Sequence, residues 1–306
     1  MTTPITRAVI LAAGTGSRLS VDGDSCPKPL RAVRGKPLLV RVLNTLRAEG
    51  VTEAVIVTGF QGDRIRRTLN DALRKEGIKL ELLFVDNPDY LKKNGVSLLS
   101  AAPFVDRECY LSMSDHLYSR KLVRRLSKAA LPAGACGLGV DYDIPRCFDL
   151  DDATKVRVQD GLIVDIAKEL PAYDALDTGV FRIGPSLIGE LRRVQAREGD
   201  CSLSQGVKAL SERGMFWACD VGNARWIDVD TPEASIEADR LLRAYGDDLS
   251  GIGWLQRPSG GWMERPGIPS NGASNSVGVF AQMRSALTAA GALLRRREVP
   301  MPSDAQ

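Results

Sequence analysis

Segments typical of buried strands alternate with segments typical of helices through the first 131 residues. The apolar runs at 7–13 and 53–59 are each followed by a stretch with helical apolar spacing, at 37–50 and 61–77. The alternation continues through expected strands at 79–86 and 108–115 and expected helices at 97–105 and 121–131. Such alternation predicts βαβ units, so we expect an α/β fold with a doubly wound, mostly parallel, Rossmann-like sheet.

The pattern changes after about residue 135. Residues 154–170 alternate apolar and polar side chains about the pair Asp160-Gly161, which predicts a β-hairpin. Further strands are expected at 174–184 and within 214–222 and 224–232, with helices at 185–197, 203–213 and 232–246. The second half of the sheet should therefore be mixed rather than parallel.

Composition sets the expected limits of the folded part. Residues 1–246 are expected to form one domain, and the Gly-, Pro- and Ser-rich residues 247–276 a linker. We expect the tail, residues 277–306, to be a poorly ordered extension. The alternative is an amphipathic helix over 277–298 that makes a weak contact with a membrane or a partner.

Charge and cysteine usage exclude several classes of protein. The 41 Lys and Arg residues nearly balance 38 Asp and Glu residues, which argues against a nucleic-acid binder driven by bulk charge. No run of about 18 apolar residues predicts a transmembrane helix, and the N-terminus lacks the pattern of a signal peptide. The six cysteines form no C-x-x-C pair, so reduced thiols are expected. These features predict a soluble cytoplasmic protein.

The first expected strand ends in the glycine-rich stretch "LAAGTGSRL", residues 11–19. A P-loop would need a lysine after its second glycine, and a dinucleotide-binding turn would need a third glycine where Leu19 stands. A third interpretation is that the turn's backbone N–H groups cradle a triphosphate, with Arg18 and Lys28 as cationic partners. A plain strand-to-helix turn that needs glycine for positive φ is the alternative.

Lys28 favours the triphosphate interpretation because Pro27 and Pro29 restrict the backbone on either side of it. "LAAGTGSRL…PKPL" resembles the signature of the nucleotidylyltransferases that activate sugar phosphates, the MobA-like NTP transferases. "NGVSLLSA", "YLSMSDHLYS", "DALDTGVFRI" and "WIDVDTPEASIEADRLL" extend the resemblance over residues 7–245. Together these segments look most like inositol-1-phosphate cytidylyltransferases.

The resemblance implies two sets of ligand-binding residues. The nucleotide-binding set is Leu11, Ala12, Ala13, Gly14, Thr15, Gly16, Ser17, Arg18, Lys28, Asn94, Gly95 and Ser97. The acceptor-binding set is Lys168, Asp177, Thr178 and Gly179, and the catalytic cations are Arg18, Lys28 and Lys168. Asn94, Gly95 and Ser97 are expected just before a short helix, where ordinary N-cap chemistry is the alternative. Lys155 and Arg157 alternate on one strand and could add positive charge to the site, but a solvent-exposed strand face accounts for them equally well.

Joining a phosphate to a nucleoside triphosphate needs positioned cations and a hard metal ion such as Mg²⁺, which carboxylates hold. Asp115 should lie at the carboxyl edge of the sheet, and Asp228 and Asp230 on one face of an extended segment. The resemblance implies metal ligands at Asp115 and in "WIDVD", with Asp228 preferred over Asp230. A turn role for Asp115 and an N-cap role for Asp230 are the alternatives. His116, the only histidine, is expected on the opposite face to Asp115 and in a structural or indirect role.

The resulting hypothesis is Mg²⁺-dependent transfer of CMP from CTP to a phosphorylated alcohol, giving a CDP-alcohol and pyrophosphate. By resemblance the acceptor is inositol 1-phosphate. The alternatives are another acceptor (phosphocholine, a sugar 1-phosphate or a phosphonate) or a non-catalytic nucleotide-binding homologue. Phosphocholine would call for an aromatic cage, to which Tyr142, Phe148 and Tyr173 could contribute. A homodimer is compatible with the sequence, and no nucleic-acid partner is expected.

Overall fold

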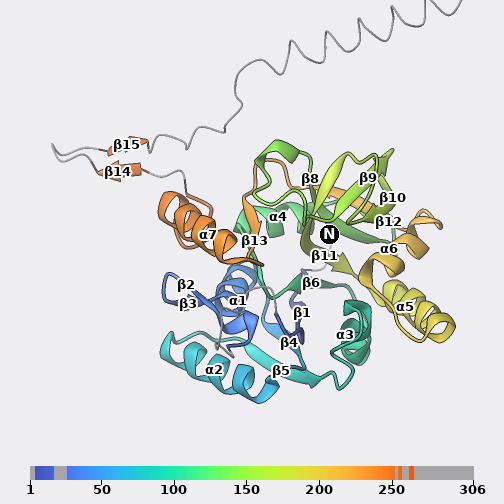
Figure 1. Ribbon diagram of the computed structural model, residues 1–306, viewed down its shortest axis with the longest axis horizontal. Helices are drawn as coiled ribbons and strands as arrows, with labels where there is room; N and C mark the ends of the chain where they lie inside the picture. The colour runs from blue at the N-terminus through green and yellow to red at the C-terminus, as the bar shows by residue number, and fades with distance from the viewer. Residues whose placement is uncertain (1–3, 17–25, 252–253, 257–261, 265–306) are drawn as a thin grey trace, which may run out of the picture. The chain divides into compact units, whose positions relative to one another are not determined.

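The computed structural model describes residues 4–16, 26–251, 254–256 and 262–264. Within them a nine-stranded sheet runs in the order β5-β4-β1-β6-β11-β8-β12-β10-β9 (Figure 1). The strands are β1 (Arg7–Ala12), β4 (Glu53–Thr58), β5 (Glu81–Asp86), β6 (Cys109–Met113), β8 (Cys136–Asp141), β9 (Lys155–Gln159), β10 (Leu162–Ala167), β11 (Ala175–Ile183) and β12 (Phe216–Asp220).

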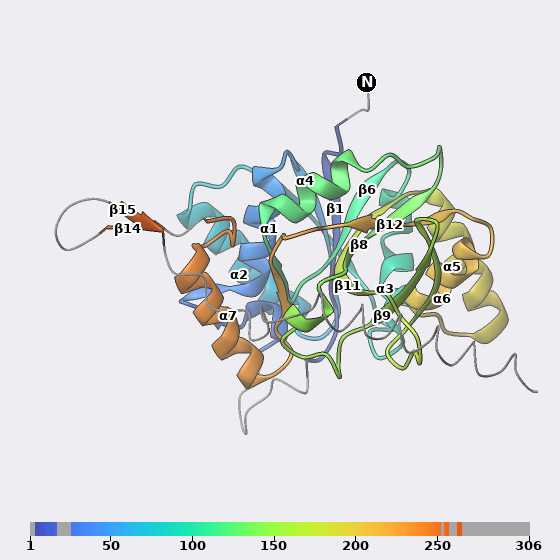
Figure 2. The ribbon, with the colours of Figure 1, turned by 90° about the horizontal axis from the view of Figure 1, so that it is seen from above.

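The first four strands, β5, β4, β1 and β6, pair in parallel, as the alternation of the sequence predicts. Their side chains alternate between two apolar layers, because successive strand residues point to opposite faces. Ile10 packs with helices α1 (Leu38–Ala48), α2 (Gly62–Lys75) and α4 (Arg120–Lys128) on one face. Val9 and Leu11 pack with α3 (Asn94–Ser100), α5 (Pro185–Glu198) and α6 (Leu203–Ser211) on the other (Figure 2). This part of the sheet is doubly wound.

The second half of the sheet is mixed, as the sequence predicts. Strand β11 is antiparallel to both β6 and β8, and the hairpin strands β9 and β10 are antiparallel to each other. Strand β9 also pairs with β11, so that β11, β8, β12, β10 and β9 close into a barrel-like ring. The predicted turn at Asp160-Gly161 is confirmed, with φ of 51° and 79°, as a type I′ hairpin turn requires.

Several predicted boundaries need correction. Helix α3 begins at Asn94 rather than at 97, so Asn94, Gly95 and Ser97 lie inside it, and the chain continues into the 3₁₀ turn η3 (Ala102–Phe104). Strand β6 ends at Met113, two residues before Asp115. Strand β13 (Trp226–Asp228) lies within the strand predicted at 224–232, but its partner β7 (His116–Tyr118), strand β8 and the pair β2 (Ala32–Val33) with β3 (Lys36–Pro37) were not predicted. They are too short or too continuously apolar to show a period.

Helix α7 (Pro232–Tyr245) follows β13 much as expected. The buried core continues past it, because Leu249 is only 2% exposed and packs with Val33, Leu38 and Leu117. The short strands β14 (Trp254–Gln256) and β15 (Trp262–Glu264) pair with each other. The tail, residues 277–306, with the alternative helix at 277–298, lies outside the described residues. All six cysteines are free thiols, and no helix in the described ranges is long and apolar enough to cross a membrane.

Candidate active site

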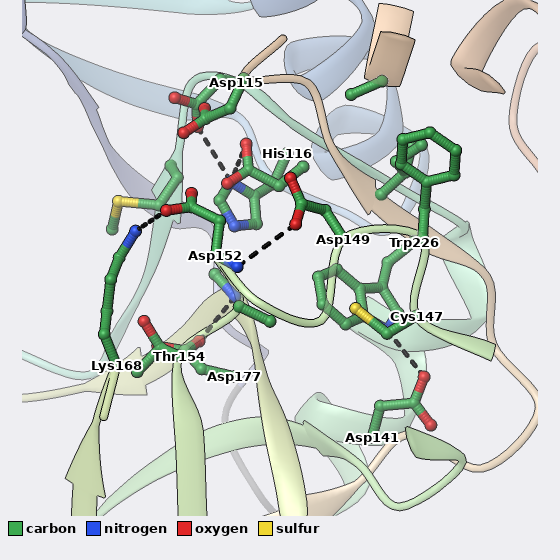
Figure 3. Close-up of a pocket in the computed structure, with 18 of the residues that line it drawn as sticks. Asp115, His116, Asp141, Cys147, Asp149, Asp152, Thr154, Lys168, Asp177 and Trp226 are labelled. Atoms are coloured by element: carbon green, nitrogen blue, oxygen red, sulfur yellow. Dashed lines mark hydrogen bonds and ion pairs between the residues drawn. The ribbon is translucent and has the colours of Figure 1, made fainter. Parts of the chain in front are cut away.

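Two cavities meet beyond the carboxyl ends of β1 and β6, where ligands bind in α/β sheets. The turn cavity, about 340 Å³, lies beside the glycine turn that follows β1. The hairpin cavity, about 270 Å³, lies beside the β9–β10 hairpin and is drawn in Figure 3. The residues that line both cavities are Lys28, Asn94, Met113, Asp115 and Asp230. Two adjoining cavities with a shared charged wall can hold two ligands whose reactive groups meet.

The predicted glycine turn forms one wall of the turn cavity. Its lining residues are Leu11, Ala13, Gly14, Thr15 and Gly16, whereas Ala12 is buried in the apolar layer under α1. Gly16 has a φ of 63°, and a Cβ there would lie 2.5 Å from the Cβ of Lys28. Glycine is therefore required so that the Lys28 segment can pass close to the turn. Ser17 and Arg18, also predicted here, lie outside the described residues.

Lys28 is the centre of the charge cluster between the cavities. It begins the 3₁₀ turn η2 (Lys28–Leu30), and its side chain is 11% exposed. Its Nζ lies 2.6 Å from Asp115 Oδ2 and 3.8 Å from Asp228 Oδ1, and it also forms an ion pair with Asp230. The sequence prediction that Asp115, Asp228 and Asp230 lie together is thus correct in geometry. Lys28, expected to contact the triphosphate, here places its single positive charge among these three carboxylates.

Burial and charge act in opposite directions on these carboxyl groups. Burial alone would raise the pKa of Asp115, but the Lys28 ammonium and the His116 ring hold that pKa well below its usual range. The pKa of Asp228 is raised, because burial and the charge of Asp115 outweigh the nearby cations. The negative charge of Asp228 is thus less compensated by its surroundings than that of Asp115.

His116 joins the cluster, contrary to the expectation that it faces away from Asp115. Its Nδ1 lies 2.9 Å from Asp115 Oδ1 and 3.6 Å from Asp228 Oδ1 (Figure 3). The prediction was wrong because Asp115 lies between β6 and β7, so the alternation of a single strand does not apply. Burial lowers the pKa of His116, but Asp228 and Asp115 together raise it to about 9. The ring stacks on Trp226, with centroids 6.3 Å apart and planes 6° from parallel.

The arrangement fits a divalent cation. One ligand atom from each of Asp115, His116 and Asp228 lies within 4.8 Å of the others, and the same holds for Asp152, Asp228 and Asp230. Asp228 belongs to both groups, and its buried Oδ1 accepts no hydrogen bond from the described part of the chain. Carboxylate oxygens are the ligands that Mg²⁺ prefers, and Asp228 offers one that the folded chain leaves without a donor.

The hairpin cavity holds most of the predicted acceptor-binding residues. Lys168, from the end of β10, forms an ion pair with Asp152 across the cavity (Figure 3). Asp177 lines the cavity and accepts a hydrogen bond of 2.7 Å from the backbone N–H of Gly179. Burial raises the pKa of Asp177 to about 6. Thr178 does not line the cavity, because its hydroxyl donates to the Gly139 carbonyl inside the sheet at 2.7 Å.

Sequence reasoning missed a second polar network that lines the hairpin cavity. Asp141, buried at the end of β8, accepts hydrogen bonds of 2.7 Å from Arg146 Nη2 and from Trp226 Nε1. Arg146 also donates to the Ala224 carbonyl at 3.0 Å, so the network joins the loop after β8 to the strand that carries Asp228. Asp141 and Trp226 are far apart in the sequence, and β8 itself was not predicted, so nothing local signalled the pair.

The other candidates differ in their surroundings. Asn94 lines both cavities and Ser97 lines the turn cavity, whereas Gly95 lines neither: a Cβ on it would lie 2.6 Å from the Cys201 carbonyl oxygen. Lys155 is buried, with its Nζ 2.9 Å from the Asp151 carbonyl oxygen, whereas Arg157 on the same strand is exposed.

Of the aromatic residues that a choline cage would need, Phe148 lines the hairpin cavity, but Tyr142 and Tyr173 do not. That proposed cage is not formed.

Comparison with known proteins agrees with this geometry. Residues 8–147 match the MobA-like NTP transferase domain. The chain is 37% identical over 228 residues to a protein of Rubrobacter xylanophilus named bifunctional IPC transferase and DIPP synthase, which covers 74% of this chain and 49% of that protein. A protein of the same name from Thermococcus kodakarensis is 34% identical, covering 82% of this chain and 54% of its own length. The chain thus spans about half the length of these curated relatives.

The structural comparison gives the same result. The solved structure of the inositol-1-phosphate CTP transferase from T. maritima superposes with a TM-score of 0.70 and 25% sequence identity, covering 83% of this chain and all of that one. The resemblance first drawn from "LAAGTGSRL…PKPL" is therefore confirmed over the α/β fold as well as over the motif. Residues 8–147 of the chain are therefore a MobA-like NTP transferase domain.

Proposed function

We propose that the protein is a cytidylyltransferase that transfers CMP from CTP to the phosphate of inositol 1-phosphate. The observation that carries the proposal is the meeting of two cavities at Lys28, Asp115 and Asp230. CTP would occupy the turn cavity and the acceptor the hairpin cavity, so that the acceptor phosphate and the α-phosphate meet at the shared wall. The name of the T. maritima relative, inositol-1-phosphate CTP transferase, supports both substrates.

The acceptor is already an anion, so the reaction needs alignment and charge neutralisation more than a general base. An oxygen of the acceptor phosphate attacks the α-phosphorus, the bond from that phosphorus to the bridging oxygen breaks, and pyrophosphate leaves. In this proposal the backbone N–H groups of Gly14–Gly16 bind the triphosphate, and Lys28, with Arg18, neutralises it. Lys168 would hold the acceptor phosphate at the opposite side of the shared wall.

A Mg²⁺ ion held by Asp115 and Asp228, with Asp230 beside them, would neutralise the phosphates and lower the charge barrier to attack. In the absence of a metal ion, the Lys28 ammonium lies among the same three carboxylates and supplies positive charge to them. A metal ion held by these carboxylates would take over that role. When a metal–nucleotide complex arrives, the Lys28 ammonium would become available to the phosphates. His116 would hold Asp115 in place through its Nδ1.

The chemistry of the hairpin cavity supports a polyol acceptor. Asp149, Asp152 and Asp177 offer carboxylate oxygens to its interior, and ring hydroxyls are the donors that such oxygens accept from. A quaternary ammonium would instead need aromatic faces around it, and the expected cage of Tyr142, Phe148 and Tyr173 is not assembled there. Inositol 1-phosphate is therefore preferred to phosphocholine.

A turnover panel tests the proposal. CTP, UTP, GTP and ATP would each be combined with inositol 1-phosphate, phosphocholine, glucose 1-phosphate and an aminoalkyl phosphonate in Mg²⁺ buffer, and pyrophosphate release measured. We expect CTP with inositol 1-phosphate to give the highest kcat/KM. Turnover of UTP with glucose 1-phosphate and none with the expected pair would refute the choice of substrates. Nucleotide binding without turnover of any pair would refute catalysis.

A further inference from the structure

A buried hydrogen bond fixes the direction of a hydroxyl on the wall of the turn cavity. Asn87 follows β5 and is 1% exposed, and its Nδ2 lies 3.0 Å from the Oγ of Ser97 in α3. Ser97 is 6% exposed and lines the turn cavity. Asn87 lines neither cavity, so any effect it has on a ligand must pass through Ser97.

The orientation of the Asn87 amide follows from a second contact. Its Oδ1 accepts a hydrogen bond of 2.9 Å from the backbone N–H of Asp89, which can only donate. The NH₂ group must therefore be the end that faces Ser97, where it donates to the hydroxyl oxygen. With that oxygen accepting, the Ser97 proton points elsewhere, and within the described ranges it reaches no acceptor. Ser97 is thus presented to the cavity as a donor.

The position of Ser97 indicates which part of a nucleotide this donor meets. The phosphate end of the turn cavity is fixed by Gly14, Gly16 and Lys28. Elsewhere the lining includes Leu11, Tyr90 and Met113, whose apolar surfaces a flat base can pack against. Cytosine carries two acceptors, O2 and N3, on its hydrogen-bonding edge, and a hydroxyl held as a donor can bind either.

We propose that Asn87 is a positioning residue that locks the Ser97 hydroxyl as a hydrogen-bond donor to an acceptor atom of the cytosine edge. This inference rests on the proposed function, because it takes CTP as the ligand of the turn cavity. Asn87 itself touches no substrate. Its effect is to set the polarity of a group that does.

The test reverses that polarity. In Asn87→Asp, one carboxylate oxygen keeps the Asp89 N–H, but the other can only accept, so the Ser97 proton turns away from the cavity. We expect the Kd for CTP, measured by calorimetry, to rise about 10- to 100-fold, because the base loses a donor and faces lone pairs. Ser97→Ala should also raise the Kd for CTP. In the double variant Asn87→Asp/Ser97→Ala, CTP should bind as it does to Ser97→Ala alone, within about twofold.

Two controls separate positioning from a structural defect. Inorganic tripolyphosphate has no base, so its Kd should be unchanged within about twofold in every variant. Ser100→Ala removes another α3 hydroxyl, which donates to the Val96 carbonyl at 3.2 Å and lines neither cavity, and CTP affinity should not change. Additive losses in the double variant, or an equal loss of tripolyphosphate binding, would overturn the inference. If CTP affinity is unchanged in Asn87→Asp while the unaltered protein turns over normally, the positioning role of Asn87 is refuted but the proposed function is not. Failure of the unaltered protein to bind CTP would refute the proposed function.

Discussion

Gly179 is the position at which a single added methyl group should harm the site most. Its φ is 73°, so any L residue there adopts a left-handed backbone, at about 1–2 kcal/mol. A Cβ would also lie 2.4 Å from Cδ2 of the His116 ring. To reach an ordinary contact the ring must move by about 1 Å, which breaks its 2.9 Å contact with Asp115. Overlap of this kind adds about 1–3 kcal/mol.

Gly199 provides a matched control. It has a φ of 74°, at the end of α5, and a Cβ there would meet nothing within 4 Å. Gly199→Ala should lower the free energy of unfolding by about 1–2 kcal/mol and leave turnover unchanged. Gly179→Ala should lower it by about 2–5 kcal/mol and reduce kcat by about 100-fold. Urea denaturation and pyrophosphate release measure the two effects. Equal destabilisation by both variants, with normal turnover in Gly179→Ala, would refute the reasoning.

Three further predictions follow from the charges of the site. Lys28→Met should lower the free energy of unfolding of the metal-free protein by about 3–5 kcal/mol, because the buried Asp230 and the partly buried Asp115 and Asp228 lose their cation. Lys36→Met, in a more exposed pair with Glu76, should cost under about 1 kcal/mol; comparable losses would contradict the burial argument. Because the pKa of His116 is raised to about 9, its contribution to stability is complete below about pH 6.5 and is lost as the pH rises through 9. His116→Gln should therefore remove about 3 kcal/mol of pH-dependent stability, seen as a flatter denaturation profile between pH 6.5 and 9 in EDTA. Lys168→Met should raise the KM for inositol 1-phosphate about 10-fold or more and leave that for CTP unchanged, whereas Arg157→Met, at an exposed position, should change neither.

The sequence predicted the parallel half of the fold because that half is built from local patterns. Each buried run and each helical spacing could be recognised within about 15 residues, and the Asp160-Gly161 turn carries its own chemistry. The closure of β9 onto β11 could not be predicted in this way, because it depends on pairing between segments with no shared local signal. The sequence therefore predicted a mixed second half but not its barrel-like closure.

The candidate site divides along similar lines. Lys28, Asp115 and Asp228 were found from motif and strand-end position, and the structure brings them together. The predicted orientation of His116 was wrong because β6 was predicted to end at Asp115. The strand ends two residues earlier, so Asp115 and His116 are not neighbours on one strand and need not point to opposite faces. Asp141, Trp226 and Asn87 were missed because each acts through a partner distant in sequence or hidden behind one that lines a cavity.

The central claim is that the α-phosphorus of CTP is attacked at the wall that the two cavities share. The most direct measurement uses CTP labelled with ³²P at either the α or the γ position, with inositol 1-phosphate and Mg²⁺. We expect the α label to appear in a CDP-linked product and the γ label in pyrophosphate, in equal amounts and only when both substrates are present. Transfer of the γ label to the acceptor, or release of pyrophosphate without acceptor, would contradict it.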